Sequence, residues 1–173
     1  MLFSRFPVEP EPIDPNQPVD VVVARWTDGA GASTLGIDTR LTLAITGLIF
    51  LAALVLGVWK YHGIRTSPAG SAHIYVDIAH RAALLYSFAG ILLAVFTELS
   101  GWPTAVNLLA DAVVLVFFIA AIASYAWHGW RRDTTNQFHG EVDGSLRLGM
   151  NALIVGEIGG FIVLFTGFLI EQF

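Results

Sequence analysis

The sequence predicts an all-α integral membrane protein, a four-transmembrane-helix bundle with an extended, proline-rich N-terminal arm. Of the 173 residues, 55% are hydrophobic and 13% are charged, whereas soluble domains carry about 25% charged residues. The mean hydropathy is +0.66. Four apolar stretches of about 20 residues hold this excess, and a helix of that length crosses the ~30 Å hydrocarbon core of a bilayer. We expect helices at about 41–60, 72–99, 105–130 and 148–171.

The composition also excludes several classes of protein. The apolar stretches lack the alternation of barrel strands, so helices that satisfy their own backbone hydrogen bonds are the expected spanning form. The chain has no cysteine, which excludes disulfides, thiolate metal sites and c-type haem attachment. Its net charge of -5 gives no support to nucleic-acid binding. The expected partners are therefore the lipid bilayer and other membrane subunits or further copies of the chain.

The first 40 residues form a separate region ahead of the bundle at 41–173. Five prolines between positions 7 and 18, with acidic residues between them, favour an extended backbone and prevent a helix. No basic start followed by an apolar core is present, so no secretory signal peptide is expected. We expect the arm at 1–40 to contact the partner subunit or a second copy.

Lysines and arginines set the expected orientation. They flank the loops after the first and third helices, while the loop "SGWPT" and the C-terminal "EQF" have none. Short loops rich in these residues stay in the cytoplasm. We therefore expect a multi-pass protein of a bacterial-type inner (cytoplasmic) membrane, with both termini outside.

Polar residues gather where the second helix begins. If that helix starts near Ser71, then His73, Asp77 and His80 lie on one face at positions i, i+4 and i+7, and Arg81 continues the stripe. The third helix ends on the same side of the membrane. A shared polar cluster is therefore expected at the cytoplasmic end of the bundle.

The end of the third helix brings Tyr125 and His128 to the depth of His80. Such a cluster suits haem ligation by a neutral imidazole, a metal site oriented by Asp77, a proton relay, or binding of a quinone head group. We take His80 as the candidate ligand of a haem iron, and His128 and Arg81 as further candidate cofactor-binding residues.

Other polar residues have simpler explanations. Histidines also anchor helices at membrane interfaces without any chemistry, and this is expected for His62, His73 and His139, which lie in predicted loops. Asn107 and Asp111 lie at i and i+4 near the start of the third helix, where solvation of the helix start accounts for them. A dedicated metal site is not favoured, because no second helix carries a His-rich or Glu-x-x-His motif.

Glu157 lies nine residues after Leu148, deep in the predicted fourth helix. A charge at that depth is unfavourable unless it is paired or protonated, and the expected partners are Arg81, Tyr125 or Asn151. The alternative is a neutral carboxyl that is hydrogen-bonded across the bundle. Tyr125 and Glu157 are the candidate catalytic residues.

The stretch "AHRAALL" with His80, the tyrosine at 125, and "NQF" at 136–138 resemble styrene oxide isomerase. That family is a four-helix membrane enzyme that binds b-type haem and converts an epoxide to an aldehyde. The resemblance implies that His80 ligates the haem iron and that Tyr125 lines the site. Tyr86 and Phe117 stand where that family has an asparagine and an aspartate.

The pair "HR" at His80 and the stretch "HGWRRD" from His128 are similar to the cytochrome b anchor of succinate dehydrogenase. That family has a quinone-side His-Arg pair and a Gly-x-Arg stretch after its haem helix. Tyr125 stands where its ligand histidine is expected, and its subunit has three spans. Both resemblances imply a small helical bundle that holds haem b near one membrane surface.

Three functions follow as expectations. The first is a small integral membrane subunit, anchor or accessory component of a redox complex of the respiratory-chain kind, with b-type haem near His80. The second is a haem-dependent membrane isomerase, which a pocket lined by Tyr86, Tyr125 and Glu157 would favour. The third is a proton-coupled transport component that uses Glu157.

Overall fold

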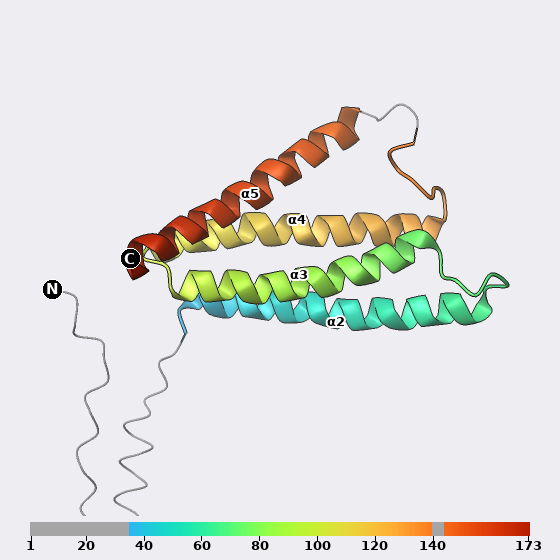
Figure 1. Ribbon diagram of the computed structural model, residues 1–173, viewed down its shortest axis with the longest axis horizontal. Coiled ribbons are helices and arrows are strands. Elements are labelled where there is room, and N and C mark those ends of the chain that lie inside the picture. Colours follow the sequence, from blue (N-terminus) through green and yellow to red (C-terminus); the bar gives the residue numbers. More distant parts are fainter. Residues whose placement is uncertain (1–34, 140–143) are drawn as a thin grey trace, which may run out of the picture. The chain divides into compact units, whose positions relative to one another are not determined.

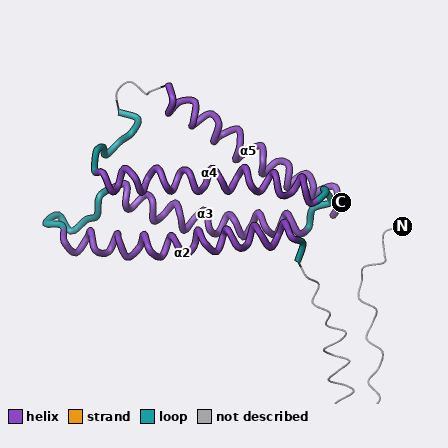
Figure 2. The backbone as a smooth tube through the Cα atoms, turned by 180° about the vertical axis from the view of Figure 1, so that it is seen from behind, coloured by secondary structure: helices purple, strands orange, loops and turns teal. Residues whose placement is uncertain are grey.

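The computed structural model describes residues 35–139 and 144–173. These residues form α2 (Ile37–Thr66), α3 (Ile74–Glu98), α4 (Thr104–Arg131) and α5 (Gly144–Gln172). Figure 2 shows helices joined by loops, with no strand in the described part of the chain. Each helix is long and apolar enough to cross a membrane. The expectation of an all-α chain with four such helices is confirmed for these residues, while the predicted arm lies outside them from residue 1 to 34.

The helices α2, α3 and α4 lie side by side, and α5 crosses them at an angle (Figure 1). The C-terminal half of α5 packs on the bundle, because its buried residues are Gly160, Leu164 and Gly167. A Cβ atom on Gly160 would lie 2.6 Å from Val114 Cγ2 and 3.0 Å from the Ala110 carbonyl oxygen. Glycine at this position therefore lets α5 approach α4 closely, as small residues do at helix contacts in membranes.

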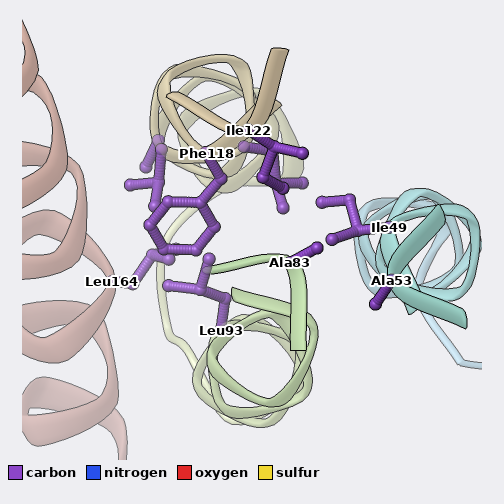
Figure 3. Packing of buried hydrophobic residues seen from close by; sticks show 10 residues of the cluster. Ile49, Ala53, Ala83, Leu93, Phe118, Ile122 and Leu164 are labelled. Atoms are coloured by element: carbon purple, nitrogen blue, oxygen red, sulfur yellow. The ribbon is translucent and has the colours of Figure 1, made fainter. Parts of the chain in front are cut away.

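Apolar side chains from all four helices meet in one core (Figure 3). Small residues fill the contact between α2 and α3, where Ala53 and Ala83 are fully buried. Bulkier side chains fill the space between α3, α4 and α5. The labelled members of this cluster are Ile49, Ala53, Ala83, Leu93, Phe118, Ile122 and Leu164.

The helix ends differ from the predicted ones because polar residues continue or cap the helices. The first helix starts at Ile37 rather than 41 and runs to Thr66 rather than 60. The second starts at Ile74 rather than 72, because His73 is its N-cap and its Nδ1 accepts a hydrogen bond from the Tyr75 N–H at 3.3 Å. Thus His73, which was expected only to anchor the helix at the membrane interface, caps α3.

Candidate functional site

Polar residues at the end where α3 begins form two groups on different faces of that helix. The first, the α2-facing group, consists of Lys60, Asp77, His80 and Arg81. Lys60 Nζ lies 2.6 Å from Asp77 Oδ1, and Arg81 Nε lies 3.1 Å from Asp77 Oδ2. The carboxylate of Asp77 therefore joins α2 to α3 and balances two cations.

The ring of His80 is held by the backbone of α2. Its Nδ1 lies 2.9 Å from the carbonyl oxygen of Ala53. Because a carbonyl only accepts, Nδ1 carries the proton of this hydrogen bond, and a neutral ring then keeps its lone pair on Nε2. The ring packs on Gly57, where a Cβ atom would lie 3.0 Å from His80 Cε1. Glycine at 57 thus makes room for the half-buried imidazole.

The second group, the α4-facing group, consists of Tyr75, Tyr125, His128 and Asp133. The ring of Tyr75 stacks on Tyr125 at 6.2 Å and lies 5.3 Å from the ring of His128. The Tyr75 hydroxyl accepts a hydrogen bond from the Gln137 N–H at 2.7 Å. This group therefore connects α3, α4 and the loop that follows α4.

His128 faces that loop rather than His80. Its Nδ1 lies 2.8 Å from Asp133 Oδ1, and this hydrogen bond is the main cause that lowers the pKa of the Asp133 carboxyl. The structure thus places both Tyr125 and His128 against Tyr75 at the end of α4. It places His80 apart from them, against α2.

Glu157 belongs to a further set of residues between α3, α4 and α5. Tyr86 stacks on Phe118, with ring centroids 4.1 Å apart and an interplanar angle of 4°, and it interacts electrostatically with Glu157 and Tyr125. The Oε1 atom of Glu157 is buried without a hydrogen-bond partner. The expected pairing of Glu157 with Arg81 is not seen, because Arg81 binds Asp77.

Sequence reasoning missed a buried polar network at the opposite end of the bundle. Asp111 Oδ2 accepts hydrogen bonds from the hydroxyls of Thr42 and Thr97, both at 2.8 Å. Asn107 Nδ2 donates to Asp38 Oδ2 at 3.2 Å. Asn107 and Asp111 are each only 2% exposed, so the expectation that solvation of the helix start accounts for them is wrong.

The spacing of the polar residues in the sequence indicates this network. Asp38 and Thr42 are spaced at i and i+4, as are Asn107 and Asp111, so each pair presents polar atoms on one helix face. Two such faces on apolar helices pair with each other. The assignment of residues up to 40 to an extended arm hid the first pair.

The described residues contain no group of three or more His, Cys, Asp and Glu side chains that is arranged to hold a metal ion. Comparisons of the chain with protein-family models, with curated proteins and with solved structures found no match. The geometry of the site is thus the basis for its functional interpretation.

Proposed function

We propose that this protein is a small integral membrane subunit, an anchor or accessory component of a membrane redox complex, that binds b-type haem through His80. The supporting observation is the hydrogen bond from His80 Nδ1 to the Ala53 carbonyl oxygen. Histidines that bind metal ions usually donate their other ring N–H to a carbonyl or carboxylate, which fixes the tautomer and the ring orientation. His80 has this arrangement, which leaves the lone pair of Nε2 to bind the haem iron.

The neighbouring residues suit such a group. Arg81 is largely exposed at the same end of the bundle, and Lys60 lies close by on α2. Both pair with Asp77 and have further N–H donors that could bind the propionate carboxylates of a haem. Bound haem would supply one-electron transfer, at a potential set by its axial ligand and surroundings. His128 belongs to the α4-facing group and is assigned no iron in this proposal.

The orientation follows from the same residues. Lys60, Arg65, Arg131 and Arg132 lie at the end of the bundle that holds His80, and the positive-inside rule places that end in the cytoplasm. We place both termini outside, in a bacterial-type inner membrane. A partner subunit or a second copy of the chain would complete the redox complex.

Absorption spectra test the haem proposal. The protein purified in detergent is measured oxidised and then reduced with dithionite, beside His80→Ala and the control His62→Ala, whose side chain is exposed on α2. We expect a Soret band in the wild type and in His62→Ala, and its loss in His80→Ala. A wild type without a Soret band, or a band that survives in His80→Ala, would contradict the proposal.

A second candidate is a haem-dependent membrane isomerase acting on an epoxide. It is supported by Tyr86 of α3, which interacts electrostatically with both Tyr125 of α4 and Glu157 of α5. A tyrosine hydroxyl placed as a general acid contributes about 100-fold or more to a rate. Conversion of styrene oxide to the aldehyde is therefore measured for the wild type, for Tyr125→Phe and for the exposed control Tyr61→Phe. We expect turnover that falls at least about 100-fold in Tyr125→Phe alone, and no turnover in the wild type would exclude this candidate.

A further inference from the structure

Two carboxyl groups are buried together at the end of the bundle where α2 and α4 begin. Asp38 lies in the first turn of α2 and is 6% exposed, and Asp111 of α4 is 2% exposed. The two groups interact electrostatically. Asn107 stands one helical turn before Asp111 and binds Asp38 through Nδ2. These three residues form what we call the carboxyl pair site.

No cation of the described residues balances this pair. Arg40 on α2 is exposed, and the basic side chains with ion pairs bind Asp77 or Asp133 at the other end. The other titratable groups at this end are also acidic: Glu98 of α3 accepts the Gly36 N–H at 3.2 Å, and Glu171 of α5 lies beside Gly101. Two ionised carboxylates buried close together repel each other and lose their hydration, so one of them takes up a proton instead.

Two buried oxygen atoms without a hydrogen-bond partner indicate which carboxyl holds this proton. The amide nitrogen of Asn107 has three acceptors within 3.5 Å, on Asp38, Thr97 and Trp102, which identifies the other amide atom as the carbonyl oxygen Oδ1. That atom is buried without a partner, and so is Asp111 Oδ1. Asp111 Oδ2 already accepts two hydroxyl protons. A proton on Asp111 Oδ1 would give the unpartnered acceptor on Asn107 a donor on the next turn of the same helix.

We propose that the carboxyl pair site binds one proton, held on Oδ1 of Asp111 and directed to Oδ1 of Asn107, with Asp38 as the ionised partner. Asp38 is suited to the charge, because it lies at the N-terminus of α2 and its Oδ1 accepts the Thr39 N–H at 3.0 Å. The site lies at the end of the bundle where α2 and α4 begin. It is separate from His80 and does not depend on haem.

The proton couples the packing of this end to pH. The folded protein holds a proton on Asp111 that the unfolded chain releases. The free energy of unfolding therefore falls as the pH rises through the range in which this proton is lost. Deprotonation leaves two like charges between α2 and α4 and loosens their contact. The hydroxyls of Thr42 and Thr97 report on the same carboxyl, since both bind Asp111 Oδ2.

Infrared spectroscopy tests the proposal through the carbonyl stretching band of a protonated carboxylic acid. The protein is measured near neutral pH with Glu157→Gln as the background, so that the carboxyl of Glu157, whose Oε1 atom is also buried, does not contribute. We expect one acid band that disappears in Asp111→Asn. It should remain in the control Asp77→Asn, whose carboxylate is paired with Lys60 and Arg81.

A second variant keeps the test decisive if Asp111→Asn does not fold. Thr97→Val keeps the shape of the side chain but removes one hydrogen bond to Asp111 Oδ2, which is the carbonyl oxygen of the proposed acid. We expect the acid band to move to higher frequency in this variant. An acid band that is absent from the Glu157→Gln protein, that survives in Asp111→Asn, or that does not move in Thr97→Val would overturn the proposal.

Discussion

Gly90 of α3 packs against Thr46 of α2 so closely that a side chain does not fit. A Cβ atom at this position would overlap Thr46 Oγ1 and would lie 2.9 Å from its Cγ2 and 3.1 Å from its Cβ. Ordinary van der Waals contact begins at 3.4 Å. Rotation of the Thr46 side chain moves Oγ1 and Cγ2 but leaves Cβ in place. The Gly90→Ala substitution therefore forces the two helix backbones apart.

The magnitude follows from two opposing effects. Overpacking a buried contact by one methyl group costs about 1–3 kcal/mol, whereas Gly→Ala in a helix interior contributes about 0.5–1 kcal/mol of stability. The difference between these two ranges is a net cost of about 0–2.5 kcal/mol, so we expect Gly90→Ala to be destabilised by up to about 2.5 kcal/mol. Gly47 of α2 is the matched control, because no atom lies within 4 Å of its added Cβ. Gly47→Ala should be stabilised by about 0.5–1 kcal/mol.

Unfolding in mixed detergent micelles gives the free energies of both variants, and a double-mutant cycle with Thr46→Ala identifies the cause. Thr46→Ala removes the overlapping Oγ1 and Cγ2 atoms and leaves only the contact at 3.1 Å. Gly90→Ala should then cost about 1 kcal/mol less in that background, within the usual range for contacting residues. Additive effects, or a Gly90→Ala protein as stable as Gly47→Ala, would refute this description of the α2–α3 contact.

Three further predictions concern the end of the bundle where α3 begins. The ion pair of Lys60 and Asp77, whose side chains are each 30% exposed, should give a coupling of about 0.5–1 kcal/mol in a cycle of Lys60→Met and Asp77→Asn, and additive effects would contradict it. Arg132 ends α4 with φ 53, so Arg132→Gly should be more stable than Arg132→Ala by about 1 kcal/mol; equal unfolding free energies would be inconsistent with that backbone. The hydrogen bond from His128 lowers the pKa of Asp133, so its contribution is present above the unfolded pKa of the carboxyl and is lost as the pH falls through the folded value. The melting temperatures of the wild type and Asp133→Asn should therefore converge in acid, and a constant difference would disprove the effect.

The class of the fold was predictable because it depends only on composition over long windows. A run of about 20 apolar residues identifies a helix that is long and apolar enough to cross a membrane, wherever its ends lie. The ends themselves depend on capping and on polar residues that hydropathy does not register. Asp38 and Thr39 belong to the first turn of α2, and His73 caps α3 through its ring.

Within the site, only the contacts between residues of the same helix were predictable. The i,i+4 spacing placed Asp77 and Arg81 together, and they form an ion pair. The neighbour that each residue faces depends on how the helices pack, which one sequence does not specify. His80 therefore binds α2 while Tyr75 and His128 meet on the side of α4, although all three lie at the same end of the bundle.

Chemical rescue of His80→Gly by free imidazole tests haem ligation by His80 most directly. The substitution removes the ring beside Gly57 and leaves space for an imidazole molecule at the same place. We predict that the variant, purified from cells supplied with haem, lacks the Soret band of the wild type and regains it when imidazole is added. A Soret band in His80→Gly without imidazole, or a wild type that binds no haem, would contradict His80 as the ligand.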